Sequence, residues 1–171
     1  LAMLLQHAGA KVDKLTLAEQ VTKVPFEENG LRGHPNDGFV GDMYSFETPG
    51  ICTYHSPITK LAQEYLDKRI VDITGCDWSE IEETLYQGIP VWVIVTSRYR
   101  FLEEEFWETW QTRHGELKIT YKEHAVVLTG YDEDNVYFND PLDYLKDRPI
   151  PKNDFIAGWK QLGQQAITYT L

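Results

Sequence analysis

Apolar residues recur at helical spacing along the first half of the chain, and turn-forming residues separate these stretches. Residues 1–9 have this spacing and finish in a glycine, which predicts the end of a helix. Thr16 followed by Glu19 is a capping-box pattern and predicts a second helix over residues 16–21. Two more helices are predicted, over residues 57–66 with Ser56 as the cap, and over residues 78–87 between the cap Asp77 and the stop Gly88.

The pattern changes in the second half, where short β-branched and aromatic runs predict strands. Residues 90–96 are almost all apolar, so they are predicted to form a central strand. Residues 97–115 mix aromatic and charged side chains and are predicted to be a covering loop with one helical turn. Strands are predicted at 70–73, 90–96, 117–121, 124–131, 136–139 and 166–171, with one late helix over 153–162. Helices that come mainly before antiparallel strands are typical of the α+β class.

Length and charge limit the possible functions. The chain has 171 residues and is predicted to form a single domain over residues 1–171. Its net charge of −11 disfavours nucleic acid as a partner, because most of the surface repels phosphates. No apolar run approaches the roughly 20 residues of a membrane span. The first helix begins inside its apolar run without a cap, so we expect a domain truncated at its N-terminus, with further residues upstream of Leu1.

The chain has two cysteines, Cys52 and Cys76, and neither belongs to a CxxC pattern or a Cys/His zinc spacing. Nothing in the sequence supports a disulfide between them, and two buried, idle thiols are favoured. Cys76 precedes a predicted helix start, a position at which a thiol gains some reactivity.

The long segment 25–57 is rich in Gly, Pro, Asn and Asp and contains several potential metal ligands. Their spacing matches no standard signature, so neither a metal site nor a cofactor is predicted. The residues considered are His34, Asp37, Asp42 and His55.

The strongest candidate chemistry lies in the predicted hairpin over residues 124–139. His124 opens the first strand, and Asp140 follows the second strand directly before Pro141. Each residue alone has an ordinary structural explanation, since histidines often open strands and Asp before Pro often forms a turn. Together they supply a general base and the carboxylate that orients it in cysteine hydrolases.

The register of this hairpin decides whether His124 and Asp140 can cooperate. If Tyr131 pairs with Val136, the two side chains lie on opposite faces of the sheet. If Tyr131 pairs with Asn135, they share a face as diagonal neighbours. We therefore predict the second register, with a three-residue loop in which Asp134 or Asn135 adopts a left-handed conformation.

Six segments of the chain match a known family, namely Leu1–Leu5, Gly38–Asp42, Pro90–Val93, Glu123–Tyr131, Asn139–Leu142 and Trp159–Gly163. Through them the chain resembles a bacterial family of papain-like cysteine peptidases related to those that process bacteriocins at double-glycine leaders. The fold that this resemblance implies is papain-like, with the helical part first and the antiparallel sheet second. It also implies that His124 is the general base and Asp140 orients it, and that the nucleophilic Cys and an oxyanion-hole Gln lie upstream of Leu1. Neither Cys52 nor Cys76 stands in a family motif.

The resemblance implies a cysteine peptidase whose partner is a peptide or protein substrate. Two alternatives stay open, because related folds share Cys/His/Asp chemistry. One is a non-catalytic module that binds a peptide or a cell-wall component, and the other is an amidase or acyl transferase. The habit of the family suggests a bacterial protein that is exported or attached to the surface. The sequence does not predict an oligomeric state.

Overall fold

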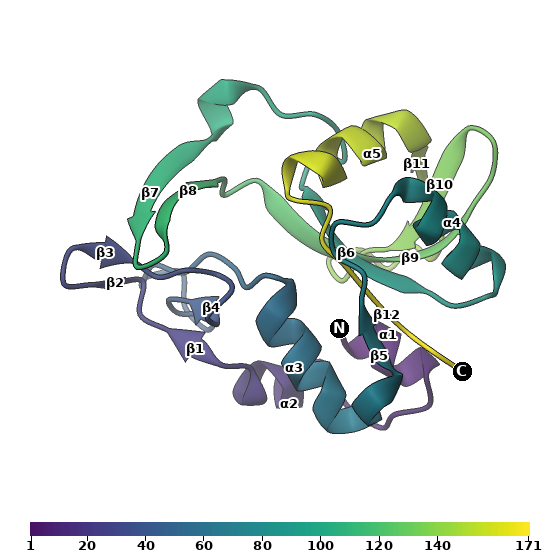
Figure 1. The fold of residues 1–171 in the computed structure, drawn as a ribbon, viewed down its shortest axis with the longest axis horizontal. Coiled ribbons are helices and arrows are strands. Elements are labelled where there is room, and N and C mark those ends of the chain that lie inside the picture. Colours follow the sequence, from purple (N-terminus) through teal and green to yellow (C-terminus); the bar gives the residue numbers. More distant parts are fainter.

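A six-stranded antiparallel sheet forms the centre of the molecule in the computed structural model, which describes residues 1–171 (Figure 1). All six residues of β6 are buried, so the predicted central strand is confirmed. The strands, in their order across the sheet, are β11 (Arg148–Pro151), β10 (Asn135–Asn139), β9 (Glu123–Tyr131), β6 (Val91–Thr96), β12 (Ala166–Tyr169) and β5 (Ile70–Asp72).

Alternate side chains of this sheet enter two separate cores, because successive residues of a strand point to opposite faces. Trp92 and Ile94 of β6 belong to the first core, whereas Val91, Val93 and Val95 belong to the second. The helices of the first core lie below the sheet in Figure 1, and those of the second lie above it. The first group comprises α1 (Ala2–His7), α2 (Lys14–Gln20) and α3 (His55–Leu66), and the second comprises α4 (Trp78–Tyr86) and α5 (Lys152–Gln161).

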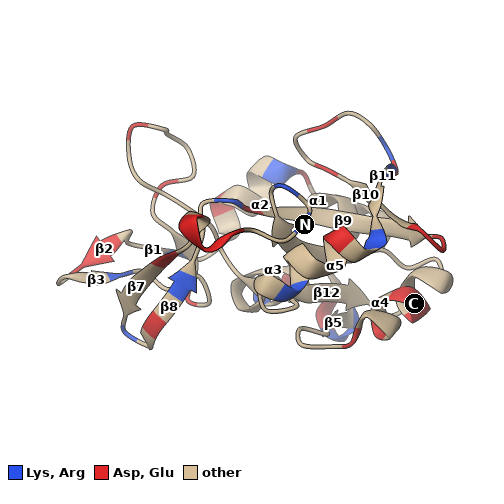
Figure 2. Ribbon diagram, turned by 90° about the horizontal axis from the view of Figure 1, so that it is seen from above, with Lys and Arg blue, Asp and Glu red and all other residues tan.

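A smaller, four-stranded sheet stands at the left of Figure 1, and Figure 2 also shows it apart from the central sheet. Strand β7 (Glu108–Thr112) lies within residues 97–115, so the prediction of a loop is wrong for that part. The 3₁₀ helix η2 (Glu104–Phe106) matches the helical turn that was expected in the same segment. Beside it β1 (Lys23–Val24) pairs in parallel with β4 (Phe39–Val40). The strand order is β2 (Glu27–Glu28), β3 (Leu31–Arg32), β7 (Glu108–Thr112) and β8 (Gly115–Ile119).

Two predicted helix caps are wrong, although the helices form. Helix α2 starts one turn earlier than expected, because Asp13 rather than Thr16 caps it, with its carboxylate accepting from the backbone N–H of Leu15 at 2.8 Å and of Thr16 at 2.9 Å. Helix α3 starts at His55, so Ser56 lies inside the helix and cannot cap it.

The remaining predictions of helices and strands agree with the structure to within about two residues. Helix α4 follows Asp77 as expected, although this side chain makes no capping bond. The 3₁₀ helix η1 (Asp67–Arg69) and strand β11 are additions that the sequence pattern did not predict. The α+β class is confirmed. None of the helices combines the length and the apolar content that crossing a bilayer requires.

Candidate active site

The hairpin of β9 and β10 does not start in the predicted register. Tyr131 lies opposite Val136, so the predicted pairing of Tyr131 with Asn135 is wrong. The carboxylate of Asp132 organises the turn instead, accepting from the backbone N–H of Asp134 at 2.9 Å and of Asn135 at 2.7 Å. Neither Asp134 nor Asn135 adopts the left-handed conformation that was expected.

A β-bulge then changes the register before the strands reach Asp140. Gly130 still lies opposite Tyr137, but Phe138 lies opposite Leu128 and Asn139 opposite Val127. Thr129 is therefore the extra residue of β9, and beyond it the strands follow the register that the catalytic arrangement needs. A bulge of this kind re-aims the side chains that follow it. Here it brings Asp140 to the face of the sheet on which His124 lies.

His124 and Asp140 form a close hydrogen-bonded pair. The distance from His124 Nε2 to Asp140 Oδ1 is 2.7 Å. The side chain of His124 is 16% exposed and that of Asp140 is 6% exposed, so solvent reaches the imidazole more than the carboxylate. Because Nε2 donates to the carboxylate, Nδ1 of the neutral ring is an acceptor, and it has no partner within the chain. The pair can therefore accept a proton at Nδ1.

Asp140 is held as an anion by its neighbours. Burial opposes its ionisation, but hydrogen bonds from Tyr99, His124 and the backbone N–H of Leu142 outweigh burial and keep the pKa of Asp140 below its ordinary value. The Leu142 N–H donates to Oδ1 at 2.8 Å. A permanent anion next to Nε2 stabilises the imidazolium that forms when His124 takes up a proton.

Tyr99 is a member of the site that sequence reasoning missed. Its hydroxyl donates to Oδ2 of Asp140, and its ring centroid lies 6.4 Å from that of His124 and 4.8 Å from that of Phe138. The Arg148 guanidinium lies 5.0 Å from the centroid of the Tyr99 ring, and its Nη1 is 4.0 Å from Asp140 Oδ2. No local sequence signal marks Tyr99, because it reaches Asp140 across 41 residues of chain.

The other face of β9 carries Glu123, next to His124 in the sequence. Burial raises the pKa of the Glu123 carboxyl to about 8. Burial, followed by the charge of Glu123, also raises the pKa of the Cys52 thiol well above its ordinary value. Cys52 belongs to the first core, whereas His124 shares the face of Val126 and Leu128 in the second core. Cys52 is therefore an inert thiol on the wrong side of the sheet for His124.

Cys76 is buried too, and burial raises its pKa to about 11. The expectation of some reactivity at Cys76 is therefore wrong, since thiolates rather than thiols react. The two cysteines lie in different cores and both are free. This agrees with the predicted idle thiols.

The residues of segment 25–57 that were considered as metal ligands do not gather into one site. Asp37 contacts Arg113 at 2.8 Å and His114 at 3.0 Å, next to His34. The Arg113 guanidinium thus already pairs with the Asp37 carboxylate that a metal ion would need as a ligand. Asp42 accepts from Thr48 within its own loop, and His55 pairs with Asp72 at 2.5 Å. No three His, Cys, Asp or Glu side chains gather as a set of ligands.

Comparison with known proteins gives the family of the chain. A model of the peptidase C39-like family matches residues 1–167. The chain belongs to this peptidase C39-like family. The predicted relation to bacterial peptidases of this kind is thereby confirmed.

Two relatives show how closely the fold is shared. The uncharacterized protein YvpB of Bacillus subtilis (strain 168) is 46% identical over 168 residues, which are 98% of this chain and 65% of YvpB. The chain thus spans just under two thirds of that relative. The crystal structure of a protein designated a C39-like peptidase from Bacillus anthracis matches with a TM-score of 0.97 and 44% identity, over 99% of this chain and 85% of that one.

Proposed function

We propose that this C39-like protein is a cysteine peptidase in which His124 is the general base and Asp140 orients it. The observation that carries the proposal is the 2.7 Å contact of Nε2 with Asp140, which leaves Nδ1 free on a partly exposed ring. A base in this state accepts the proton of a thiol and later returns it to a leaving group. The nucleophile is a cysteine in the segment upstream of Leu1.

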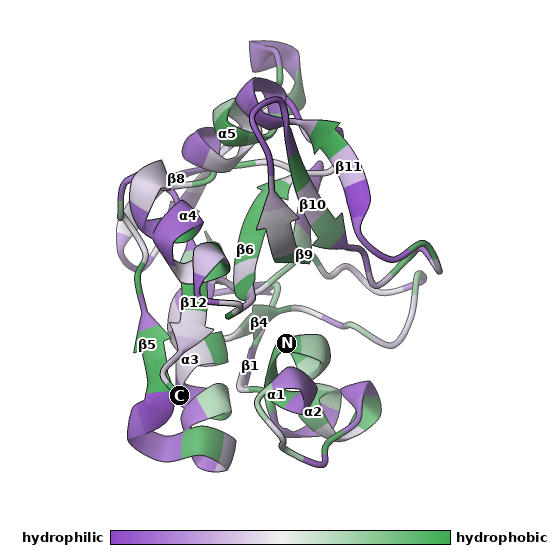
Figure 3. Cartoon of the chain, turned by 90° about the vertical axis from the view of Figure 1, so that its right-hand side faces the viewer, coloured by the Kyte–Doolittle hydropathy of each residue, from purple (hydrophilic) through white to green (hydrophobic).

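The position of α1 limits the path by which an upstream thiol can reach His124. Leu1 and Ala125 both pack against the first core, so the start of α1 lies on the face of β9 opposite His124. His124 is the second residue of β9, at the end of the strand, and in Figures 2 and 3 the N-terminus lies near the part of the sheet that β9 forms. The proposal therefore requires the segment leading into α1 to pass around this strand end to reach the imidazole.

The chemistry has two halves. His124 Nδ1 takes the thiol proton, and the thiolate adds to the carbonyl carbon of the substrate peptide bond. The imidazolium gives the proton to the amine nitrogen as the C–N bond breaks, which leaves a thioester. His124 then takes a proton from water as the hydroxide adds to the thioester carbonyl, and it returns this proton to the sulfur as the C–S bond breaks, so that the acid product leaves and the thiol is restored. Asp140 stays ionised throughout and stabilises each imidazolium.

The test uses the protein with its upstream segment and a peptide library analysed by mass spectrometry. We expect His124→Ala to lower kcat/KM by at least about 10³-fold, because both halves need the base. His55→Ala is the matched control, since it removes a histidine that also pairs with a carboxylate, and it should change kcat/KM by less than about twofold. Equal cleavage by the wild type and His124→Ala would overturn the role of His124 as the base, and no cleavage by the wild type would favour a binding module without catalysis.

A further inference from the structure

Tyr99 adopts a backbone conformation that an aromatic residue rarely takes. Its φ is 55°, in the left-handed region, yet the side chain is buried. A non-glycine residue in this region costs on the order of 1 kcal/mol, so surrounding contacts must hold it there. This conformation, in the turn directly after β6, turns the Tyr99 hydroxyl toward Asp140.

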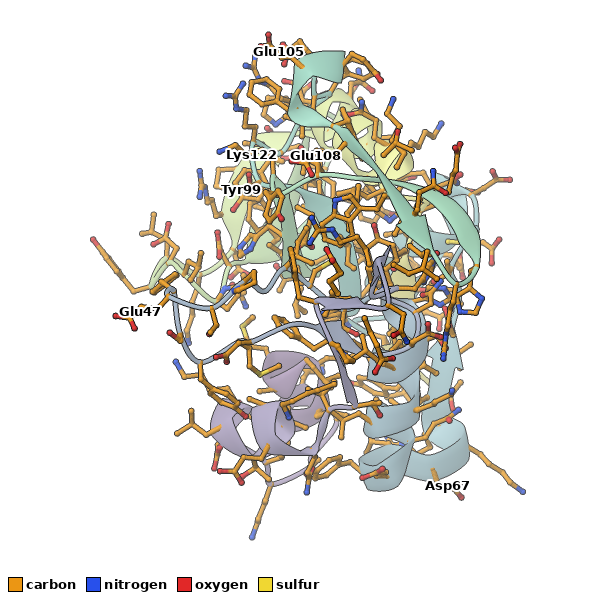
Figure 4. The ribbon with its side chains drawn as sticks, turned by 90° about the vertical axis from the view of Figure 1, so that its left-hand side faces the viewer. Glu47, Asp67, Tyr99, Glu105, Glu108 and Lys122 are labelled. Atoms are coloured by element: carbon orange, nitrogen blue, oxygen red, sulfur yellow. The ribbon has the colours of Figure 1, made fainter.

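The turn is fixed at the end of β6 by Thr96. The Thr96 carbonyl accepts from the Tyr99 N–H at 2.8 Å, and the Thr96 hydroxyl donates to the carbonyl of Arg100 at 2.6 Å. The Ser97 N–H donates to the carbonyl of Lys122, which directly precedes β9, at 2.7 Å. Figure 4 shows Tyr99 and Lys122 close together on the same side of the molecule.

Helix α5 supports the turn from outside. Gln161 accepts from the Leu102 N–H at 2.7 Å and donates to the Leu102 carbonyl at 2.9 Å. Gly158 lets the helix approach closely, since a Cβ there would lie 2.8 Å from both the Arg100 carbonyl oxygen and Thr96 Oγ1. The turn that carries Tyr99 is thus held by β6, by the start of β9 and by α5.

The Tyr99 hydroxyl completes the set of donors around Asp140. Oδ1 accepts from His124 and from the Leu142 N–H, and Oδ2 accepts from Tyr99. Three donors from three separate segments leave the carboxylate little freedom to rotate. A fixed carboxylate in turn fixes the plane of the imidazole and the direction of Nδ1.

We propose that Tyr99 is a positioning residue, which holds Asp140 and through it the imidazole of His124. Its kinetic consequence rests on the peptidase function proposed above. Tyr99 does not touch the reacting atoms, so its loss lowers the rate of the chemical step without changing how a peptide binds. The structural consequence is a change in the pKa of Asp140, which can be measured whether or not the protein cleaves a peptide.

The test compares Tyr99→Phe with Tyr137→Phe. Tyr99→Phe keeps the ring between Phe138 and Arg148 and removes only the hydroxyl. Tyr137→Phe is the matched control, because the Tyr137 hydroxyl also donates to a carboxylate, that of Asp132 at 2.6 Å, on an exposed part of the hairpin. The carboxyl pKa values are followed by ¹³C NMR, and kcat and KM are measured on a cleaved peptide.

We expect Tyr99→Phe to raise the pKa of Asp140, since a hydrogen bond to the charged form is lost. It should lower kcat about 10-fold and leave KM within about twofold. Tyr137→Phe should raise the pKa of Asp132 and change neither Asp140 nor kcat. An unchanged Asp140 pKa in Tyr99→Phe, an unchanged kcat, or an equal loss of kcat in both variants would overturn the proposal. If the wild type cleaves no peptide, the peptidase proposal fails, while the pKa of Asp140 still decides whether Tyr99 holds it.

Discussion

The two closest of the three His–Asp pairs in the molecule have different surroundings. His124 and Asp140 lie 2.7 Å apart, and His55 and Asp72 lie 2.5 Å apart. In the first pair the carboxylate side chain is 6% exposed, whereas in the second it is 27% exposed. His124 uses Nε2 and keeps Nδ1 free, while His55 uses Nδ1. The contact alone therefore does not distinguish a candidate catalytic pair from an ordinary surface pair.

The surroundings of the two carboxylates make the distinction. Asp72 accepts from Thr59 at 3.2 Å and from the Thr74 N–H at 3.0 Å, and it sits beside solvent. Asp140 has the hydroxyl of Tyr99 and a guanidinium around it, and the Tyr99 ring packs in turn on the ring of Phe138. Exclusion of water strengthens the interaction between an anion and an imidazolium. Burial and hydrogen bonds from distant segments, rather than the His–Asp contact itself, therefore distinguish the candidate catalytic pair from the other pair.

The largest contrast should appear when each carboxylate becomes an amide. Asp140→Asn removes the anion that stabilises the imidazolium, so kcat/KM on a cleaved peptide should fall by about 10²-fold. Asp72→Asn should stay within about twofold, since its pair is exposed and screened. Steady-state kinetics on both variants checks this. A similar loss in the two variants would remove the distinction between the pairs.

Gly158→Ala tests whether α5 supports the site. Its Cβ would lie 2.8 Å from the Arg100 carbonyl oxygen and force the turn or the helix to move. We expect a loss of about 1–3 kcal/mol in the free energy of unfolding, measured by urea denaturation. Gly130→Ala is the control on β9, because nothing lies within 4 Å of its Cβ and its φ is not in the left-handed region. Equal stability of the two variants would show that α5 does not constrain the turn.

Glu123 sharpens the comparison from the other face of β9, where a half-buried carboxyl lacks the hydrogen-bond donors that Asp140 has. Its pKa is raised from 4.5 to about 8, so the folded state binds the proton more tightly than the unfolded state does. Its contribution to stability is therefore complete below pH 4.5 and is lost as the pH rises through about 8. Glu123→Gln should be more stable than the wild type at pH 8.5 by about 1 kcal/mol, and the difference should shrink toward pH 5. Urea denaturation at both pH values measures it, and a difference independent of pH would contradict the assignment.

Arg148 should have the smallest effect. Its Nη1 is 4.0 Å from Asp140 and 3.8 Å from Asp143, and its side chain is 36% exposed, so each ion pair is weak. We expect Arg148→Gln to lower kcat/KM by less than about threefold. Kinetics at low and high salt checks this, and a loss as large as that of Asp140→Asn would make Arg148 a main support of the carboxylate.

Strand periodicity and turn residues are local signals, and they predicted the α+β class. The pairing of His124 with Asp140 was predicted because the catalytic arrangement of cysteine hydrolases requires it. The sequence did not predict how the pairing arises. A period-two pattern cannot reveal the bulge at Thr129, since one extra residue leaves the apolar pattern intact on either side. Nor could it reveal Tyr99, which depends on a left-handed residue and on Gly158 from a distant helix. The two wrong caps, at Thr16 and Ser56, failed because other residues nearby start the helices.

The most direct test of the central claim is the pH dependence of thiol alkylation in the protein with its upstream segment. Cys52→Ser and Cys76→Ser remove the two buried thiols, so that only an upstream cysteine can react. The account predicts one alkylated cysteine whose rate has a midpoint below about pH 7, and a midpoint that moves to about pH 8.5 in His124→Ala. The absence of a reactive thiol, or the same midpoint with and without His124, would contradict it.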